Sequence, residues 1–405
     1  MAKKSKPAFV CQYCGAKFSA WMGKCSACGE WNTLVEDVTQ SDLKSAGNNL
    51  ESVSSTKLSD LKSSRRISTA DLDMDEILGG GFVPGSVVLL AGEPGIGKST
   101  LLLQLAAIAS IQTDVLYISG EESVEQIGLR SARLKAQNDK LKLVSSNSAD
   151  DIATTISSSD CGLAIVDSIQ TVGVADVSSA LGSVSQITNA AHLLIKAAKL
   201  SNTALILVGH VTKEGSIAGP KILEHVVDVV LQLEGDRYGG FKILRSSKNR
   251  FGSTNESAIY EMTDRGLKVV ENPSAALLAE RQVSDGSVVL ATLEGVRPLL
   301  VEVQALVNPT SYGYPKRAAS GIDLNRVNLL IAMLERRTKL KLGDKDIYVN
   351  IVGGLKINEP AADLAICMAI ASAAKGMQLK KDAVVFGEVG LSGEVRRVPF
   401  MEKRL

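Results

Sequence analysis

Short apolar runs alternate along much of the chain with longer stretches in which apolar residues recur every three to four positions. The short runs have the length of buried strands, and the longer stretches have the period of amphipathic helices. Strands are predicted at 87–91, 115–119, 141–144, 163–167 and 204–209, and helices at 71–78, 101–111, 123–137 and 186–200. This alternation predicts an α/β fold built on a parallel sheet.

Two polar stretches interrupt this pattern. Residues 36–66 are rich in Ser, Asn, Asp and Lys and contain few large apolar side chains, which indicates a mobile linker. Residues 211–220 are too polar for a core and are expected to form a mobile loop that faces a ligand. After this loop, strand-like runs return at 226–233, 241–246 and 258–262.

The turn between the first core strand and the first core helix carries the clearest chemistry. It reads Gly92-Glu93-Pro94-Gly95-Ile96-Gly97-Lys98-Ser99-Thr100, which matches the phosphate-binding pattern G-x-x-x-x-G-K-[ST]. Backbone N–H groups of such a turn surround phosphate oxygens, and the helix N-terminus adds its partial positive charge. We expect the turn to bind ATP or ADP, with Lys98 reaching the β- and γ-phosphates of ATP and Ser99 ligating Mg²⁺. The strand–turn–helix context favours this interpretation over a glycine-rich turn that binds nothing.

Polar residues also follow three other predicted strands, at the edge where open α/β sheets bind ligands. Asp167 ends one strand and is the candidate Mg²⁺ acid, with a helix cap as the alternative. Glu121 follows a second strand and is the candidate that activates the attacking water, with a capping box involving Ser119 as the alternative. His210 ends a third strand and is expected to sense the γ-phosphate, unless it is a core histidine with satisfied hydrogen bonds.

A cationic segment lies between two of the later strand-like runs. It reads Lys248-Asn249-Arg250-Phe251-Gly252 and combines two cations with an aromatic residue. A solvated hairpin would explain this composition. The sharper interpretation is a finger, in which Lys248 and Arg250 offer positive charge to the γ-phosphate of a neighbouring subunit.

Four of the six cysteines form two C-x-x-C pairs, Cys11 with Cys14 and Cys25 with Cys28, each followed by a glycine. Two such turns supply four thiolates, which suits a structural Zn²⁺ site. A redox dithiol and an iron site of similar geometry are the alternatives. Four thiolates leave no open coordination position, so the site is expected to serve structure or partner docking.

Composition adds limits to this picture. With 405 residues the chain has room for two or three domains, and 45% hydrophobic and 22% charged residues are ordinary for a globular protein. A formal net charge of +1 excludes a globally basic nucleic-acid binder, although a local basic surface stays open. No apolar run is long enough to cross a bilayer, and the basic N-terminus leads into cysteines instead of an apolar signal core. We therefore expect a cytoplasmic protein without a membrane partner, in which clustered thiols hold metal.

Taken in this order, the cysteine pairs and residues 92–100, 118–123 and 248–252 resemble those of the bacterial RadA (Sms) family, which is related to RecA and DnaB. The resemblance covers essentially the whole chain, and Lys-Asn-Arg-Phe-Gly is its most specific motif. It implies a RecA-like P-loop ATPase in a homo-hexameric ring, which acts on single-stranded and branched DNA alongside the RecA recombinase. The implied activity is DNA-stimulated ATP hydrolysis with helicase-like branch migration in recombination and repair. By resemblance to the loops of RecA, Lys213 is the expected internal DNA contact.

From about Asn272 the chain resembles the proteolytic domain of Lon. The likeness is carried by residues 353–355, Pro360 and 387–394. In Lon a lysine activates a serine nucleophile, but here Ala361 stands where the serine is needed and Arg404 stands near the lysine position. A guanidinium stays charged and cannot act as a base. The resemblance therefore implies an inactive α+β domain that assembles subunits or offers a basic surface.

The candidate DNA contacts of this basic surface are the run Tyr314-Pro315-Lys316-Arg317 and Arg326, and a solvated charged face is the alternative for each. The chain stops soon after Pro399, earlier than the resemblance to Lon leads us to expect.

The predicted organisation is a four-cysteine zinc-binding domain at 1–35, a linker at 36–66, a RecA-like ATPase domain at 67–271 and a Lon-protease-like domain at 272–405. Two other functions stay open beside the DNA motor. One is an ATP-regulated scaffold or switch, and the other is an ATP-dependent Lon-like protease.

Overall fold

The structure is a computed structural model, and the residues that it describes are 9–11, 16–18, 22–31, 34–36, 66–211, 217–218, 222–235, 241–311 and 313–405. The chain divides into two compact units, Met1–Lys62 and Ser63–Leu405. The predicted domain boundaries near residues 35, 66 and 271 stay predictions.

The first unit contains a small antiparallel sheet. Its strands are β1 (Phe9–Cys11), β2 (Lys17–Phe18) and β3 (Leu34–Glu36), with β1 in the middle. The buried side chains of Cys11 and Cys25 form its core, and Phe9, Phe18 and Cys28 pack against them. The core that the described residues form is small, and units with a small core usually depend on a metal or on disulfides.

The second unit is organised around a ten-stranded sheet. Its strands are β4 (Val87–Gly92), β5 (Val115–Ser119), β6 (Leu141–Ser145), β7 (Leu163–Asp167), β8 (Ala204–Val211), β9 (Ile217–Ala218), β10 (Val229–Gly235), β11 (Phe241–Asn249), β12 (Ser257–Thr263) and β13 (Gly266–Val269). The order is β13-β12-β11-β10-β4-β8-β7-β5-β6, with β9 paired to β8. The strands from β10 to β6 are parallel, and β11, β12 and β13 continue the sheet as antiparallel neighbours.

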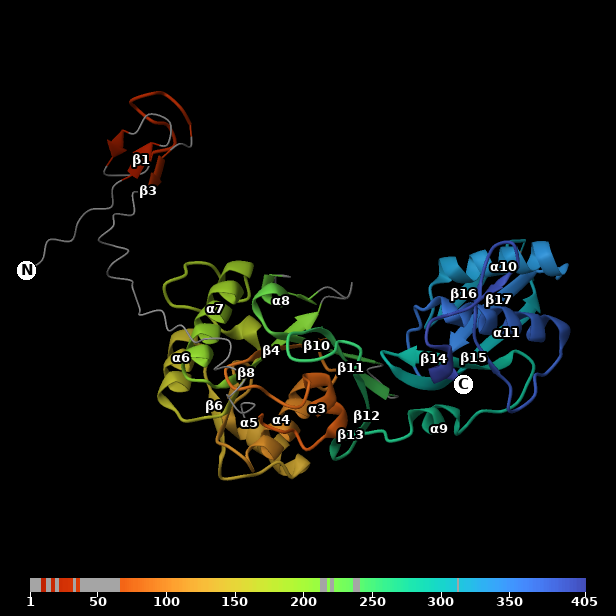
Figure 1. Cartoon of the computed structure of the whole chain (residues 1–405), viewed down its shortest axis with the longest axis horizontal. Coiled ribbons are helices and arrows are strands. Elements are labelled where there is room, and N and C mark those ends of the chain that lie inside the picture. The colour runs from red at the N-terminus through yellow and green to blue at the C-terminus, as the bar shows by residue number, and fades with distance from the viewer. Residues whose placement is uncertain are drawn as a thin grey trace, which may run out of the picture. The chain divides into compact units, whose positions relative to one another are not determined.

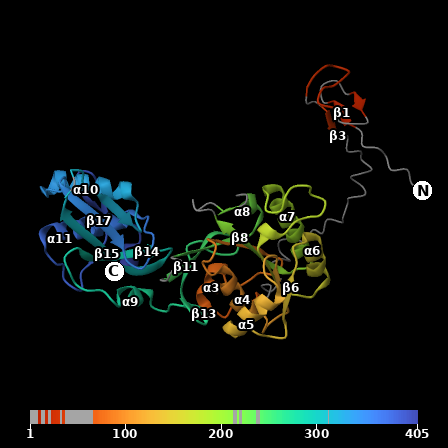
Figure 2. The same cartoon turned by 180° about the vertical axis from the view of Figure 1, so that it is seen from behind.

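Helices cover both faces of this sheet (Figure 1, Figure 2). They are α3 (Leu72–Leu78), α4 (Lys98–Ala109), α5 (Val124–Leu134), α6 (Ala149–Ser158), α7 (Val184–Leu200) and α8 (Ile222–Val226). Because side chains alternate along a strand, Val88 and Leu90 of β4 pack with α3, α4 and α5. Val87 and Leu89 pack instead with α6 and α7. The sheet is thus buried on both sides, as its apolar runs predict.

The elements differ from the predicted ones mainly at their ends. The predicted strands at 115–119 and 163–167 are confirmed, whereas the helix expected to reach residue 137 ends at Leu134, because Lys135 adopts a left-handed conformation. The strand expected from residue 226 begins at Val229, since α8 occupies the residues before it. Strand β11 continues to Asn249, so the cationic segment begins inside a strand and not at a turn.

The C-terminal part of this unit is an α+β arrangement. Its elements are α9 (Pro273–Leu278), β14 (Ser287–Glu294), β15 (Arg297–Pro309), β16 (Arg317–Ser320), α10 (Leu324–Thr338), β17 (Lys345–Ile351), α11 (Asp363–Lys375), β18 (Val384–Val385), β19 (Glu388–Val389), β20 (Val395–Arg396) and α12 (Met401–Arg404). Five strands form a mixed sheet in the order β16-β17-β15-β14-β18. Helices α10 and α11 share its core, which Ile243 and Ile259 of the large sheet also enter. The predicted class, an α/β core with a cysteine ribbon and an α+β C-terminal part, is confirmed.

Among the described residues, no helix combines the length and the hydrophobicity that a bilayer span requires.

Candidate functional site

The phosphate-binding turn lies at the carboxyl end of β4 and leads into α4. Strands β8 and β7 separate β4 from β5, the next strand along the chain, so the turn lies at a switch point of the sheet, where α/β proteins bind ligands. Gly97 precedes the helix with φ 113°, and a Cβ there would lie 2.7 Å from Cε of Met262. The turn therefore needs glycine at this position for both its conformation and its packing.

Lys98 is held over this turn by hydrogen bonds from its ammonium group. Lys98 is only 4% exposed, and its Nζ donates to the carbonyl oxygens of Gly92 at 2.8 Å and Glu93 at 3.0 Å. Burial lowers the pKa of Lys98 to about 8, although the charges of Asp167 and Glu121 act in the opposite direction. A buried cation at a helix N-terminus fits an anionic ligand, because a phosphate would offset the cost of its desolvation.

Asp167 lies at the end of β7 and is buried. Its Oδ2 accepts a hydrogen bond of 2.7 Å from the hydroxyl of Tyr117, which lies on the neighbouring strand β5. Burial, and then the Asp167 charge, raises the pKa of Tyr117 well above its usual value, so the phenol keeps its proton and stays a donor. The helix-cap alternative for Asp167 is wrong, because Ser168 precedes the short 3-10 helix Ile169–Thr171. Sequence reasoning missed Tyr117, and its only signal is a hydroxyl inside an apolar strand.

Glu121 and His210 lie beside each other at the same edge of the sheet. Oε1 of Glu121 accepts a 2.6 Å hydrogen bond from the hydroxyl of Ser168, and Nε2 of His210 lies 3.6 Å from the same oxygen. Nδ1 of His210 lies 3.1 Å from Nζ of Lys98, and the histidine side chain is 28% exposed. The core-histidine alternative is therefore wrong, because His210 joins the two charged candidates at the surface of the site.

The capping-box alternative for Glu121 is wrong as well. The box at the start of α5 is made by Ser123 and Gln126. The hydroxyl of Ser119 accepts hydrogen bonds from the amides of Glu121 and Glu122, which fixes the backbone after β5 and leaves the Glu121 carboxylate directed to Ser168. The structure thus brings Lys98, Glu121, Asp167 and His210 together, and Ser168 is a member that sequence reasoning missed.

Lys248 and Arg250 lie elsewhere. Lys248 is paired with Val230 of β10, and Val230 is paired with Leu89 of β4, whereas the phosphate-binding turn begins at Gly92. Gly92 lies three positions after Leu89, which is about 10 Å along the strand. The cationic segment therefore lies toward the amino end of β4, away from the turn of its own chain.

The Lys248 ammonium group is engaged locally. Its Nζ donates to the carbonyl oxygens of Glu224 at 2.7 Å, His225 at 3.2 Å and Val227 at 2.8 Å, at the end of α8. Burial, and then the charge of Arg250, lowers the pKa of Lys248.

Arg250 is held in place by contacts of the cationic segment with its surroundings. Its guanidinium is 55% exposed and lies 3.0 Å from the carboxylate of the buried Asp228. Nδ2 of the Asn249 side chain donates to the carbonyl of Ile77 at 2.8 Å, at the end of α3. The segment is therefore fixed from two sides, unlike a solvated hairpin.

The cysteines of the first unit have the geometry of a metal site. Sγ atoms of Cys11, Cys25 and Cys28 lie within 4.8 Å of one another, and the Cys11–Cys28 separation is 3.7 Å. Thiolates at about 2.3 Å from a tetrahedral Zn²⁺ are about 3.8 Å apart, so these donors fit zinc. Cys14, the fourth predicted ligand, lies outside the described residues.

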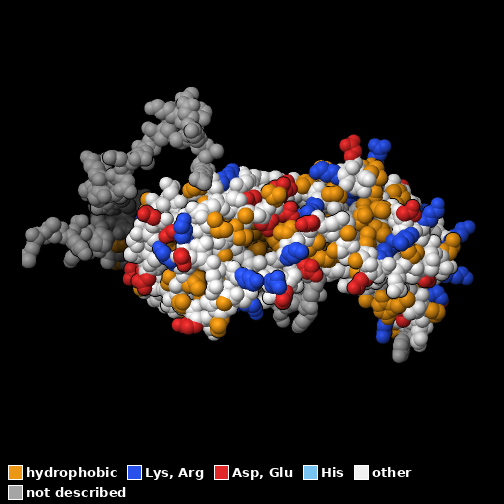
Figure 3. Space-filling view, turned by 90° about the horizontal axis from the view of Figure 1, so that it is seen from below, with side chains coloured by type: hydrophobic (Ala, Val, Ile, Leu, Met, Phe, Trp, Pro, Cys, Tyr) orange, Lys and Arg blue, Asp and Glu red, His pale blue; other side chains and the backbone are white. Residues whose placement is uncertain are grey.

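The candidate DNA contacts differ in their surroundings. Lys213 lies outside the described residues. Lys316 is exposed just ahead of β16, and its amide donates to Asp346. Arg326 forms two hydrogen bonds to the buried carboxylate of Asp363, so its guanidinium is engaged within the protein. Figure 3 shows charges of both signs interspersed over the face that it presents, with several Lys and Arg side chains on the C-terminal part.

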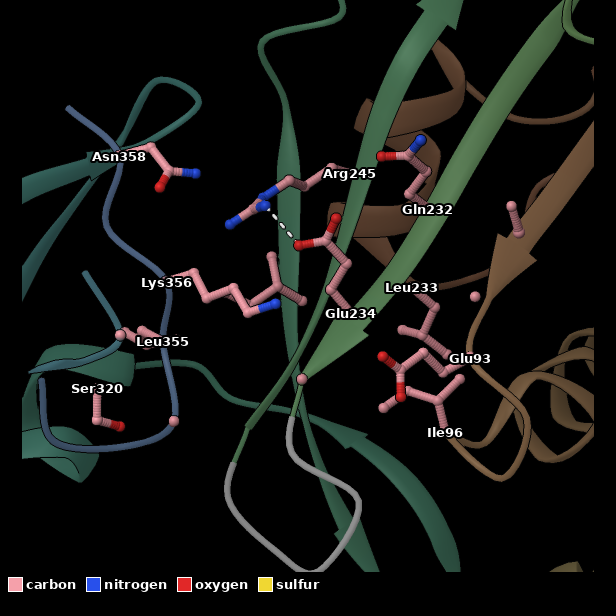
Figure 4. Close-up of a pocket in the computed structure, with 16 residues that line it drawn as sticks. Glu93, Ile96, Gln232, Leu233, Glu234, Arg245, Ser320, Leu355, Lys356 and Asn358 are labelled. Carbon is pink, nitrogen blue, oxygen red and sulfur yellow. Dashed lines mark hydrogen bonds and ion pairs between the residues drawn. The ribbon is translucent and has the colours of Figure 1, made fainter. Parts of the chain in front are cut away.

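A cavity of about 480 Å³ adjoins the start of the phosphate-binding turn (Figure 4). Its wall combines Gly92 and Glu93 with the end of β10 on one side, and Lys356 and Asn358 of the C-terminal part on the other. Arg245 lines the cavity, and its Nη1 lies 2.7 Å from Oε2 of Glu234, which also lines it.

An ion pair occupies the region that resembles a protease centre. Ala361 is fully buried, and the guanidinium of Arg404 binds the carboxylate of Glu359, with Nη1 2.9 Å from Oε1. Nη1 also donates to the carbonyl of Ala291 at 2.8 Å. Neither a nucleophile nor a base is found at these positions.

Known proteins match both units. A family model described as "AAA domain" matches residues 54–216, and one described as "Rubredoxin metal binding domain" matches residues 9–36. The chain is 47% identical to DNA repair protein RadA of Halalkalibacterium halodurans, over 100% of this chain and 90% of that protein. It is 48% identical to DNA repair protein RadA of Bacillus subtilis (99% and 90%) and 44% identical to that of Escherichia coli (100% and 90%). Among solved structures, the RadB recombinase superposes on 51% of this chain and 100% of its own, with a TM-score of 0.40 and 23% identity.

Proposed function

This chain belongs to the family of DNA repair protein RadA, and we propose that it is a RecA-like ATPase that acts as an ATP-driven motor on DNA recombination intermediates. In this proposal a homo-hexameric ring binds single-stranded and branched DNA and promotes branch migration beside RecA. One observation carries it: the cationic segment Lys248–Gly252 lies too far from the phosphate-binding turn of its own chain to complete that site, as the strand register indicates. The two halves of the site meet only when a second copy supplies the finger.

The proposed roles follow from the positions of the side chains. Lys98 leaves the carbonyls of Gly92 and Glu93 and holds the β- and γ-phosphates, while the amides of residues 92–100 surround them. Ser99 and Asp167 hold Mg²⁺, which supplies charge neutralisation at the phosphates when bound. Tyr117 keeps the Asp167 carboxylate in one orientation.

Glu121 is the proposed base for the attacking water. Its carboxylate is kept at the site by Ser168, and His210 links it to Lys98, so a change at the γ-phosphate reaches both side chains. Lys248 and Arg250 contact the γ-phosphate bound to the neighbouring copy and stabilise the charge that develops there.

DNA is assigned to the inside of the ring through Lys213 and, on the C-terminal part, through Lys316 and Arg317. Such phosphate contacts are largely independent of base sequence and weaken strongly with salt. Zn²⁺ is assigned to Cys11, Cys14, Cys25 and Cys28, where it holds the first unit together for docking of a partner.

The test is complementation between two inactive variants, Lys98→Ala and Lys248→Ala. Lys98→Ala lacks phosphate binding but keeps its finger, and Lys248→Ala keeps the phosphate site but lacks the finger. Each variant by itself is expected to lose about a thousand-fold or more in turnover, while Lys248→Ala keeps its ATP affinity. In an equal mixture, about a quarter of the interfaces combine an intact site with an intact finger.

Turnover of the coexpressed mixture should therefore rise to a measurable fraction of the wild-type rate. Lys199→Ala, which removes an exposed lysine in the last turn of α7, serves as the control and should leave turnover unchanged. A mixture as inactive as its components, or loss of ATP binding in Lys248→Ala, would show that Lys248 acts within its own chain.

Two other functions are distinguished by simple assays. A switch or scaffold should hydrolyse ATP equally with and without single-stranded DNA, whereas a motor should be stimulated and should displace a labelled strand from a three-stranded junction. An ATP-dependent protease should degrade casein, which the buried Ala361 and the Arg404–Glu359 pair oppose.

A further inference from the structure

The turn of the β14–β15 hairpin lies against the ATPase part of the same unit. We refer to its residues, Glu294, Gly295, Val296 and Arg297, as the hairpin tip. The amide of Val296 donates to the carbonyl of Asn255 at 2.8 Å, and the carbonyl of Glu294 accepts from the hydroxyl of Ser257 at 2.9 Å. A Cβ on Gly295 would lie 1.9 Å from the Asn255 oxygen, so the two backbones are in direct contact.

The hairpin tip also forms two charged contacts. Nη1 of Arg297 donates to Oδ2 of Asp73 on α3 at 2.7 Å, and both side chains are largely withdrawn from solvent. The carboxylate of Glu294 accepts two hydrogen bonds from Arg245 on β11, one of them 2.7 Å long. Arg245 in turn pairs with Glu234, in the cavity that begins at the phosphate-binding turn (Figure 4).

Helix α3, which Arg297 contacts, supports one side of the finger. At its far end the carbonyl of Ile77 accepts from the side chain of Asn249. Immediately after the helix, a Cβ on Gly79 would lie 2.5 Å from the carbonyl oxygen of Phe251 and 3.1 Å from Gly252. A shift of α3 would therefore move residues 249–252 with it, because these contacts are too close to yield independently.

We propose that the hairpin tip positions the finger, and that Arg297 is a positioning residue for hydrolysis at the neighbouring subunit. The C-terminal part then contacts the ATPase part at two places. It contacts α3, which lies beside the finger, and it contacts Arg245, which lies beside the nucleotide site of the same chain. The inference rests on the proposed action of Lys248 and Arg250 across a subunit boundary.

The central variant is Arg297→Ala, measured in the full chain. We expect kcat for ATP to fall by about two- to thirty-fold, the range of a residue that acts through a coupled network. ATP affinity at the subunit's own site should stay unchanged, because none of the contacts of Lys98 is altered. Arg396→Ala is the matched control: it removes an arginine–carboxylate pair confined to the C-terminal part, Arg396 with Glu394, and should leave kcat unchanged.

Complementation identifies which half of the site is impaired. Coexpression of Arg297→Ala with Lys98→Ala should raise turnover per intact phosphate site, because in an equal mixture about half of these sites adjoin a Lys98→Ala copy that supplies a correctly placed finger. A second pair of substitutions, Asp73→Arg with Arg297→Asp, exchanges the charges and should recover the wild-type rate. The charge exchange tests the role of Arg297 even if Arg297→Ala lowers the yield of folded protein.

Three results would overturn the inference: wild-type kcat in Arg297→Ala, a loss of kcat that Lys98→Ala subunits do not partly restore, or no recovery in the charge exchange. Failure of the proposed function is recognised separately. In that case Lys248→Ala also fails to complement Lys98→Ala, whereas failure of this inference alone leaves that complementation intact.

Discussion

Arg404 offers a direct test of how the C-terminal part is held together. Its side chain is 1% exposed, and it binds both carboxylate oxygens of Glu359 while donating to the backbone carbonyls of Ala291 and Pro399. Glu359 also accepts from the hydroxyl of Thr292 and from the amide of Leu293 at 3.0 Å. The perturbation is Arg404→Ala, which removes the only guanidinium of this network among the described residues.

The expected cost follows from what remains after the substitution. Removing one partner of a buried ion pair costs about 3–5 kcal/mol, because the other charge stays buried without compensation. Glu359 is 25% exposed and keeps two other hydrogen-bond donors, which favours the lower end of this range. We therefore expect a loss of about 3 kcal/mol in the free energy of unfolding near pH 7.

The pH dependence supplies a second, independent signature. Burial raises the pKa of Glu359, but the bonds from Arg404, Thr292 and Leu293 outweigh it and hold the pKa below its ordinary value. In the wild type the stabilisation that the ionised Glu359 provides is fully present above the pKa of a glutamate in the unfolded chain, about 4.3. This stabilisation is lost as the pH falls through the pKa of Glu359 in the folded protein. Without Arg404 both its hydrogen bond and its charge, which lower the pKa of Glu359, are lost, so this pKa is higher in the variant than in the wild type. The carboxylate of the variant is then protonated at higher pH, so the deficit of the variant should shrink on acidification.

The assay is urea unfolding followed by circular dichroism at about pH 7.5 and about pH 5, for the wild type and the variant. Arg396→Ala, which breaks a pair whose side chains are 61% and 40% exposed, is the control and should change stability by less than about 0.5 kcal/mol. A deficit below about 1 kcal/mol for Arg404→Ala, or one that grows on acidification, would refute this reasoning.

Two further predictions concern the ligands. Burial lowers the pKa of Lys98 to about 8, and phosphates bind the charged form of this lysine. ATP affinity should therefore fall by up to about tenfold per pH unit above about pH 8, and ATP binding should be accompanied by uptake of a proton. Calorimetry in two buffers of different ionisation enthalpy measures the affinity and the proton uptake, and an affinity that stays constant up to about pH 9.5 would contradict the prediction. Cys25→Ser should release zinc, measured by atomic absorption, and leave the basal ATPase rate unchanged, because the cysteines and the phosphate-binding turn belong to different units; a basal rate that fell with the zinc content would disprove this independence.

Local sequence patterns specify some parts of the candidate site and leave others unspecified. The turn at residues 92–100 was predictable because consecutive residues make it, and its strand–turn–helix context is visible in the apolar pattern. The cysteine pairs are local in the same way. The places of Asp167, Glu121 and His210 at strand ends were also predictable, since each of these residues follows an apolar run. Their partners were not, because Tyr117 meets Asp167 only through the pairing of β5 with β7.

Local sequence patterns therefore specify the chemistry that is available: a phosphate-binding turn, a cysteine cluster, acids at strand ends and a cationic segment. Tertiary structure alone decided which of these act together. Strand order and register set the finger apart from its own phosphate site, and packing joined Arg297 to Asp73 across 224 positions of the chain. The physical reason is that hydrophobic periodicity specifies the face that a residue buries, whereas partners across a sheet depend on long-range pairings that no local pattern encodes.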